Sequence, residues 1–477
     1  MVTISPPRIY RKEGKAYFSA DIAYSNISRE LYFSISEEYV NYFSLERSDA
    51  FLVALIPIIA KYGGEVTVGG CISNKLQFQL VHILSPVLKH IDSRFHPLVI
   101  HAVTSAESLS GSHASGTGCS AGIDSLATIA KYTRADTPPA WKLSHALFLN
   151  AGSHYMPFSE EHEKNVEHAK ILFDGRLNNA RQLCQEVGLH LITMDTNLYD
   201  FVDEWNHQAI HTYWDSACVL AMQKLFSHYM YASTYHVEKF AFKPLDPAYY
   251  EQLLLECFST ESVQFHSSLY TLYRFQRTEI VTQFPLSKKY LNVCLWDIQN
   301  CGKCHKCVRT MFQLDLLGKL DEYKHVFPVD DYRLHPERTW DILRKDRGYW
   351  DEYTTQYFGL VNDPAEREAF QSKLKQNNNT SSPVIVNDLC QSDELISLKH
   401  KVDHLENELH SNTMFLLSRP PYSILRLQYY RYKLMSKITW GKKREKYATK
   451  KQVCRCQVRK LRQIMKSSRN NIPNLYL

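Results

Sequence analysis

Short apolar runs and longer amphipathic stretches alternate along the first two thirds of the chain. Residues 16–20 and 31–35 are rich in aromatic and aliphatic side chains, which is typical of strands. The almost wholly apolar segment 49–62 predicts a buried helix. Residues 65–68 predict a further strand, which we expect the following two glycines to close. We therefore expect residues 1–95 to form a small α/β unit.

The alternation of strand-like and helix-like segments continues through residues 96–330. Apolar runs at 98–103, 147–150 and 189–197 predict strands, and the apolar pattern of 205–240 predicts helix. Because helical segments separate successive strands, we expect a parallel sheet with helices on both faces. The expected fold class is therefore α/β.

The pattern changes beyond this region. Residues 331–375 are charged and aromatic and predict a helical extension, and residues 376–392 form a polar linker. Leucine and valine recur every three or four positions from 395 to 409, which predicts an amphipathic helix over 393–412. Two interpretations stay open: this helix pairs with a second copy of the chain, giving a homo-oligomer, or it packs on the body of the same chain.

Charge is unevenly divided along the 477 residues, although the net charge is only +6. Residues 419–469 hold 17 Lys and Arg against one acidic residue, and the rest of the chain holds 39 basic and 49 acidic side chains. The basic tail, residues 413–477, also carries Trp, Tyr and Leu, and this mixture suits an anionic membrane surface. Nucleic acid is a less favoured partner because no nucleic-acid-binding motif accompanies the tail, and a solvated tail is the third interpretation.

Neither a run of about 18 apolar residues nor the apolar core of a signal peptide occurs in the sequence. We therefore expect a cytoplasmic protein, peripheral on the inner face of the cell membrane if the tail binds lipid.

Four of the twelve cysteines lie within fourteen residues, in the pattern C-x6-C-x2-C-x2-C. Two thiolates separated by two residues can reach one metal ion from a tight turn, and four thiolates suit tetrahedral Zn²⁺. Disulfides are not expected without an export signal, whereas an iron–sulfur cluster, a redox pair and free thiols remain alternatives. We expect a structural zinc site at Cys294, Cys301, Cys304 and Cys307.

Residues 118–125 read G-C-S-A-G-I-D-S, a turn of small residues before an apolar helix. The backbone N–H groups of such a turn, the helix N-terminus and the hydroxyls of Ser120 and Ser125 suit a phosphate. Asp124 would repel a phosphate unless Mg²⁺ lies between the two groups. An ordinary strand-to-helix turn of small residues is the alternative.

This loop resembles the PP-loop, S-G-G-x-D-S, of the N-type ATP pyrophosphatases. These enzymes cleave ATP between the α- and β-phosphates and leave AMP on an activated substrate. Ala121 stands where the family usually has glycine, and alanine fits badly if the backbone there needs a positive φ. The combination with a later cysteine knuckle is similar to 7-cyano-7-deazaguanine synthase. Residues 300–311 also resemble a segment, N-C-G-x-C-x-K-C-x-R-T-M, of bacterial PP-loop proteins that accompany envelope-polysaccharide genes.

The resemblance covers roughly residues 1–330 and implies a PP-loop (HUP-like) fold with ATP, Mg²⁺ and Zn²⁺ as ligands. It implies that Ser120, Asp124 and Ser125 are the catalytic residues. It further implies that Leu149 and Asn150 contact adenine. For Arg277, neutralisation of pyrophosphate and a surface ion pair are equally open, and the same holds for Arg274. The full set of expected nucleotide-binding residues is Ser120, Ala121, Gly122, Ile123, Asp124, Ser125, Leu149, Asn150 and Arg277.

The resemblance also implies a reaction. An oxygen of the substrate, such as a carboxylate, would attack the α-phosphorus of ATP, and a nucleophile such as ammonia would then displace AMP. The acceptor would be a small molecule or a glycan precursor of the cell envelope. Two alternatives are a tRNA thiolase with a persulfide on Cys119, and a non-catalytic scaffold at the inner membrane whose PP-loop has lost its activity.

Overall fold

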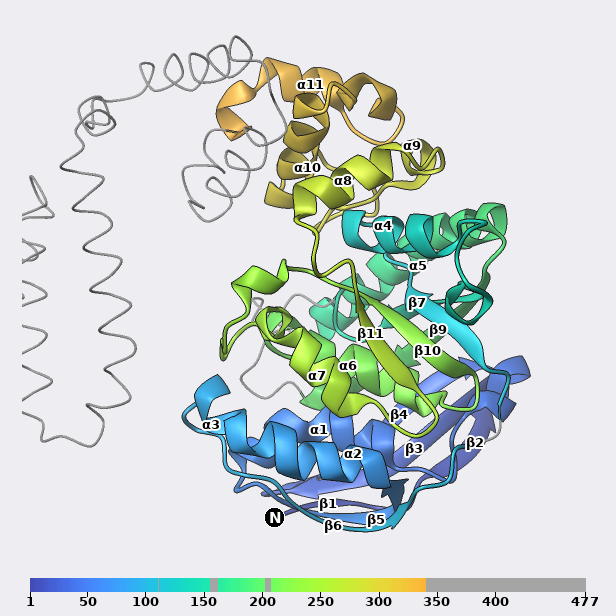
Figure 1. Cartoon of the computed structure of the whole chain (residues 1–477), viewed down its shortest axis with the longest axis vertical. Coiled ribbons are helices and arrows are strands. Elements are labelled where there is room, and N and C mark those ends of the chain that lie inside the picture. The colour runs from blue at the N-terminus through green and yellow to red at the C-terminus, as the bar shows by residue number, and fades with distance from the viewer. Residues whose placement is uncertain (110, 155–161, 202–206, 340–477) are drawn as a thin grey trace, which may run out of the picture. The chain divides into compact units, whose positions relative to one another are not determined.

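The computed structural model describes residues 1–339 apart from 110, 155–161 and 202–206 (Figure 1). Several predicted segments therefore lie outside the described residues: most of the helical extension, the polar linker, the amphipathic helix over 393–412 and the basic tail.

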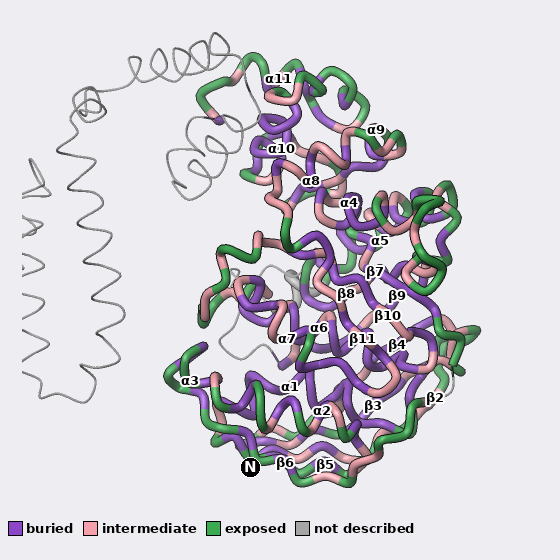
Figure 2. Tube along the Cα trace, in the orientation of Figure 1, coloured by how far each residue is buried: buried purple, intermediate pink, exposed green. Residues whose placement is uncertain are grey.

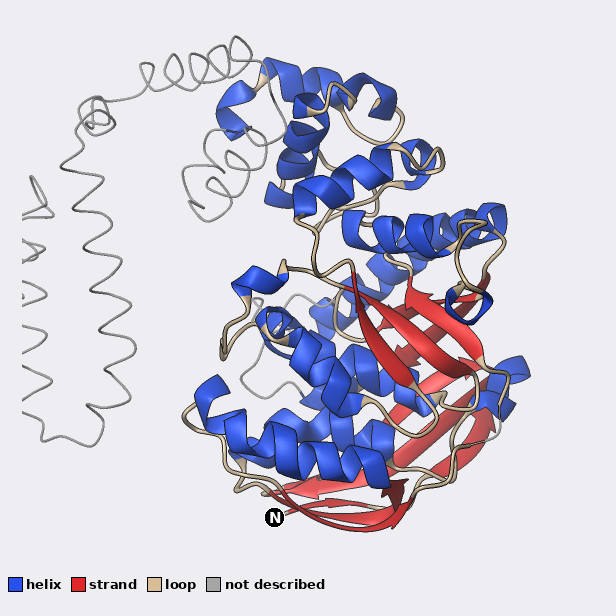
Figure 3. Cartoon of the chain, in the orientation of Figure 1, coloured by secondary structure: helices blue, strands red, loops and turns tan. Residues whose placement is uncertain are grey.

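Within the described residues, eleven strands form one mixed sheet (Figure 3). Six of the ten pairings between strands are parallel and four are antiparallel. The α/β class is confirmed, but the sheet is not parallel throughout, because the N-terminal strands join it. The strands are β1 (Val2–Ile4), β2 (Arg8–Lys12), β3 (Lys15–Tyr24), β4 (Ile27–Ser36), β5 (Glu65–Ser73), β6 (Val99–Ser105), β7 (Ala114–Gly118), β8 (His145–Asn150), β9 (His190–Thr196), β10 (Phe226–Ala232) and β11 (Gln264–Ser268).

One half of the sheet is entirely parallel, in the order β9-β8-β7-β10-β11. In chain order this is 3-2-1-4-5, so the direction of winding reverses between β7 and β10. Ligands of doubly wound α/β proteins bind at the carboxyl ends of the strands at such a switch point. The 118–125 loop follows β7 and therefore lies where this topology favours a ligand.

The other half of the sheet has the order β4-β3-β1-β5-β6 and joins the parallel half through the antiparallel pair β4–β9. Strand β5 continues to Ser73, so the expectation that Gly69 and Gly70 close it is wrong. A Cβ at Gly70 would lie 2.2 Å from Ser48 Oγ, which shows that these glycines permit a close approach inside the strand. Strand β6, expected before the loop, pairs with β5.

Helices cover both faces of the parallel half of the sheet, whereas the strands of the other half contribute to only one apolar core. Alternate residues of β8 belong to two separate apolar cores, Leu147 to one and Ala146 and Phe148 to the other. Helices α1, α6 and α7 supply the first core, and α4, α5, α8 and α10 supply the second. Figure 2 marks the buried positions along the trace in purple. The helices are α1 (Asp49–Lys61), α2 (Asn74–Gln79), α3 (Leu88–Ile91), α4 (Ile123–Tyr132), α5 (His162–Val187), α6 (His207–Ala221), α7 (Glu251–Phe258), α8 (Arg274–Thr282), α9 (Ser287–Tyr290), α10 (His305–Leu316) and α11 (Val329–Leu334).

The helix expected over 205–240 ends at Ala221, and the second half of that segment is strand β10. Strand β10 lies between β7 and β11 and packs into both apolar cores, and periodicity does not distinguish such a run from a buried helix. No helix in the described part of the chain combines the length and the apolarity that a membrane span requires.

Candidate functional site

The loop between β7 and α4 is shaped by its own serines. Ser125 Oγ donates to the carbonyl oxygen of Gly118 at 2.8 Å and accepts the N–H of Ser120 at 3.2 Å. Ser120 Oγ accepts the N–H of Gly122 at 3.3 Å, and its own hydroxyl hydrogen has no acceptor among the described residues. Ser125 therefore holds the loop together, whereas the exposed Ser120 has a hydroxyl that is able to donate to a ligand.

Ala121 adopts the left-handed conformation that glycine reaches most easily, with φ +56°. This conformation costs an L-residue about 1–2 kcal/mol. The side chain of Ala121 is only 2% exposed and belongs to the second core. The N–H of Asn292 donates to the carbonyl oxygen of Ala121 at 2.9 Å, so a contact from a distant segment holds this peptide in place.

Two arginines of α8 bind the carboxylate of Asp124. Arg274 Nη1 lies 2.7 Å from Asp124 Oδ2, and Arg277 Nη1 lies 2.8 Å from Asp124 Oδ1. Arg277 also donates to the carbonyl oxygens of Ser233 and Thr234, which follow β10. Because the side chain of Arg277 is only 1% exposed, the surface ion pair considered for it is wrong. Arg277 therefore connects α4, through Asp124, to the residues that follow β10 on the other side of the switch point.

Two more cations, Lys306 and Arg309 of α10, act on the same carboxylate. Burial by itself would raise the pKa of Asp124, but the charges of Arg274, Arg277, Arg309 and Lys306 lower it below its ordinary value. Burial, together with the charges of Arg274 and Arg309, lowers the pKa of Lys306 to about 8. Positive charge thus exceeds negative charge beside the loop.

The residues expected to contact adenine lie at the end of β8. Asn150 Nδ2 donates to Asp195 Oδ1 at 2.9 Å, so the ends of β8 and β9 meet. Leu149 is half-buried and packs against the first core. Within the described residues no hydrogen bond joins Leu149 or Asn150 to the 118–125 loop, and their contact with adenine stays a prediction.

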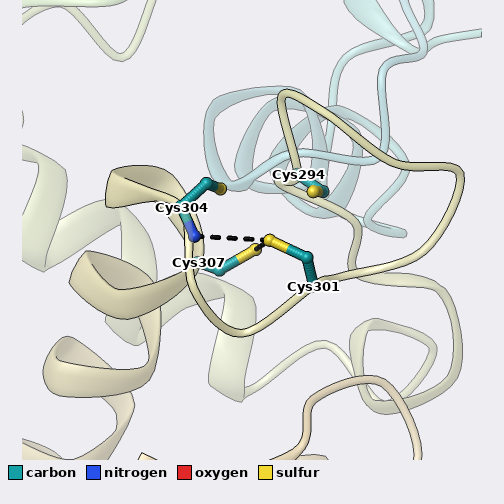
Figure 4. A group of neighbouring side chains, drawn as sticks. All are labelled: Cys294, Cys301, Cys304 and Cys307. Atoms are coloured by element: carbon teal, nitrogen blue, oxygen red, sulfur yellow. Dashed lines mark hydrogen bonds between the residues drawn. The ribbon is translucent and has the colours of Figure 1, made fainter. Parts of the chain in front are cut away.

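The four cysteines come together between α9 and the start of α10 (Figure 4), where they could hold a metal ion. Their sulfur atoms lie within 4.8 Å of one another, and four thiolates around Zn²⁺ at 2.3 Å would be about 3.8 Å apart. The N–H of Cys304 donates to Cys301 Sγ at 3.3 Å, which stabilises a thiolate there. A Cβ at Gly302, where φ is +71°, would lie 2.3 Å from Pro328 Cγ. The donor set and this tight turn fit zinc.

Asn292 joins the cysteine loop to the 118–125 loop. Its backbone N–H binds the carbonyl oxygen of Ala121, and its side-chain Oδ1 accepts the N–H of Cys294 at 3.2 Å. Its Nδ2 donates to the carbonyl oxygen of Ile298 at 2.6 Å. The metal site and the candidate phosphate site are therefore one connected structure.

Sequence reasoning assigned no role to Asn292, Lys306 or Arg309. A signal was present for the two cations, because residues three apart on a helix share a face and both follow the cysteine turn. Nothing in the local pattern marked Asn292, whose partner lies 171 positions earlier in the chain.

Cys119, the candidate persulfide carrier of a tRNA thiolase, lies in the second core. The thiol of Cys184 donates to Cys119 Sγ at 3.7 Å, and this hydrogen bond together with burial raises the pKa of Cys119 well above its ordinary value. A buried thiol that resists ionisation is a poor nucleophile, so this geometry does not favour the thiolase alternative.

Comparison of the chain with family models, with curated proteins and with solved structures gives no match. The functional argument therefore depends on the fold and on the contacts described above.

Proposed function

We propose that this chain binds ATP at the carboxyl end of β7 and uses it to activate a substrate, with release of pyrophosphate. One observation carries the proposal: the 118–125 loop lies at the switch point between β7 and β10, beside cations that outnumber the charge of Asp124. The N-terminus of α4 adds N–H groups and a positive dipole end. A polyphosphate is the ligand that these features favour together, and the resemblance to the PP-loop adds adenosine.

The serines and arginines of the site have distinct roles in this proposal. Ser120 donates its hydroxyl hydrogen to a phosphate oxygen, and Ser125 preserves the shape of the loop. Arg274, the more exposed of the two arginines on Asp124, turns to the phosphate. Arg277 stays bound to Asp124 and to the carbonyl oxygens that follow β10. Mg²⁺ accompanies the triphosphate and offsets part of its charge.

The proposed reaction is transfer of AMP to the substrate. A carboxylate oxygen of a small-molecule or glycan-precursor acceptor attacks the α-phosphorus, and the bond between that phosphorus and the bridging oxygen breaks. Pyrophosphate leaves with the electron pair, and the cations beside the loop stabilise its charge. Ammonia or another nucleophile then displaces AMP from the acyl-adenylate. A place in envelope-polysaccharide synthesis at the inner membrane is part of the proposal and depends on the resemblance and on the basic tail.

A non-catalytic nucleotide-binding scaffold is the second candidate. The observation that favours it is the engagement of Asp124 by two arginines, which leaves the carboxylate occupied before any ligand arrives. In this case the site would bind ATP without releasing pyrophosphate.

Calorimetric titration of the zinc-loaded protein with a non-hydrolysable ATP analogue and Mg²⁺ tests binding. We expect micromolar affinity in the wild type and an affinity at least about tenfold weaker in Ser120→Ala, because a hydrogen bond to a charged group contributes roughly 1.5–3 kcal/mol. Ser28→Ala, which changes an exposed serine of β4, is the matched control and should bind like the wild type.

Pyrophosphate release in the presence of ATP and candidate carboxylate acceptors then separates the two candidates. Release that depends on an acceptor supports the activating enzyme, and tight binding without release across the acceptors supports the scaffold. A folded wild-type protein that binds no ATP analogue would overturn both.

A further inference from the structure

Helix α10 starts at the cysteine cluster and contains two cations whose charges act on Asp124 of the candidate phosphate site. Cys304 is the N-cap of this helix, Lys306 is its second residue, and Arg309 follows three positions later. Lys306 is partly buried, and no carboxylate in the described part of the chain forms an ion pair with it. Arg274 and Arg309 repel its ammonium, and Asp124 and Cys304 attract it. A partly buried ammonium in a surplus of positive charge favours an incoming anion.

Two hydrogen-bonded connections join the cysteine segment to the loop and α10 to α8. In the first, the N–H of Asn292 binds the carbonyl oxygen of Ala121 at 2.9 Å, while the Asn292 side chain accepts the N–H of Cys294. In the second, Thr278 Oγ1 of α8 donates to Gln313 Oε1 of α10 at 3.0 Å. The loop is therefore connected to the cysteine segment, and α8 is connected to α10. The cysteine cluster lies at the start of α10.

We propose that the metal-loaded cysteine cluster builds one wall of the phosphate site, in which Lys306 binds a phosphate of the ligand directly. A metal ion draws Cys301, Cys304 and Cys307 to one point and so fixes the first turn of α10, from which Lys306 projects. Without the metal this turn loses its anchor, and Lys306 is no longer held beside Asp124. The inference depends on the proposed function for the identity of the ligand, but it concerns the polyphosphate group and not the adenosine.

Titration with pyrophosphate and, in parallel, with the ATP analogue tests the role of Lys306. We expect Lys306→Met to weaken the binding of both ligands at least about tenfold, because the ammonium would contact a charged phosphate. Lys303→Met is the matched control, since it removes the same charge from an exposed position of the same turn. The control should bind both ligands like the wild type, and metal analysis should find unchanged zinc in both variants.

A second arm removes the metal with a chelator, measures the zinc that remains, and repeats the pyrophosphate titration alongside circular dichroism. We expect metal-free protein to lose pyrophosphate affinity to an extent similar to Lys306→Met, and zinc to restore it. Metal-free protein that stays folded and binds pyrophosphate like the wild type would overturn the role of the metal. If chelation unfolds the chain, the zinc-loaded Lys306→Met variant still decides the role of the lysine.

The outcomes separate this inference from the proposed function. A wild-type protein that binds neither pyrophosphate nor the ATP analogue would overturn the proposed function itself. A wild type that binds both, together with a Lys306→Met variant that binds them equally well, would overturn only the inference.

Discussion

Replacement of Asp124 by asparagine gives a sharp test of how the site is charged. Asp124 binds Arg274 at 2.7 Å and Arg277 at 2.8 Å, and Arg277 is almost fully buried. Removal of one partner of a buried ion pair typically costs 3–5 kcal/mol, because the other charge stays buried without compensation. Since 23% of the Asp124 side chain is exposed, we expect the lower end, about 3 kcal/mol of lost free energy of unfolding.

The same change should strengthen the binding of a polyphosphate in the absence of Mg²⁺. Two unit charges 4 Å apart near a protein surface interact by about 4 kcal/mol. Even a third of this repulsion, relieved by Asp124→Asn, corresponds to about a tenfold gain in pyrophosphate affinity. Pyrophosphate should also raise the melting temperature of Asp124→Asn more than that of the wild type, because a ligand stabilises the state that it binds.

Urea unfolding and pyrophosphate titration, each with and without Mg²⁺, measure these two effects. The control is Asp136→Asn, which removes an exposed carboxylate paired with Arg134 at 2.8 Å and should change neither quantity. Weaker pyrophosphate binding by Asp124→Asn without Mg²⁺ would refute the view of Asp124 as a counterion of the arginines. A loss of affinity confined to the Mg²⁺ titration would instead identify Asp124 as a metal ligand.

Two further predictions concern the loop and two histidines, His145 of β8 and His266 of β11. Ala121→Gly should relieve about 1–2 kcal/mol of left-handed strain. It also loses a buried methyl that contributes about 0.8 kcal/mol, and the greater conformational entropy of the unfolded chain costs about 0.4–1 kcal/mol more. Stability in urea should therefore change by less than about 1 kcal/mol, without the large gain in nucleotide affinity that a decayed loop would show. Burial and the neighbouring His190 lower the pKa of His145 to about 4, and burial and His228 do the same for His266. The unfolded chain, with histidine pKa values of about 6.5, takes up protons between pH 6.5 and 4 that the folded protein does not. The melting temperature should therefore fall as the pH drops through this window, and the double variant His145→Gln/His266→Gln should flatten that dependence.

The sequence predicted the elements whose pattern is local and missed what depends on distant pairing. Strands β3 and β4 and helix α1 follow from runs of residues that carry their own signal. The single mixed sheet depends on a pairing such as Ser34 with Asp195, which lie far apart in the chain. The pattern of strand β10 wrongly predicted helix, because a strand buried on both faces lacks the alternation that would reveal it.

The candidate site shows the same contrast between features with a local sequence pattern and features that depend on distant residues. The spacing of Cys294, Cys301, Cys304 and Cys307 indicated their assembly, since all four belong to one short segment. The small residues of 118–125 likewise indicated a loop, because that signal is contained in eight consecutive positions. The partners of Asp124 were not predictable, because Arg277 lies 153 positions away and its burial depends on the packing of α8 against α4.

The left-handed conformation of Ala121 and the cysteine segment are connected. A glycine at this position would reach a positive φ at little cost, whereas alanine needs an external contact to hold it there. Asn292 supplies that contact through the carbonyl oxygen of Ala121, and its side chain is in turn fixed by the backbone of Cys294 and Ile298. The cysteine segment thus helps to hold Ala121 in its left-handed conformation. The loop can therefore keep a left-handed residue with a buried methyl, and its shape depends on the segment that also carries Lys306.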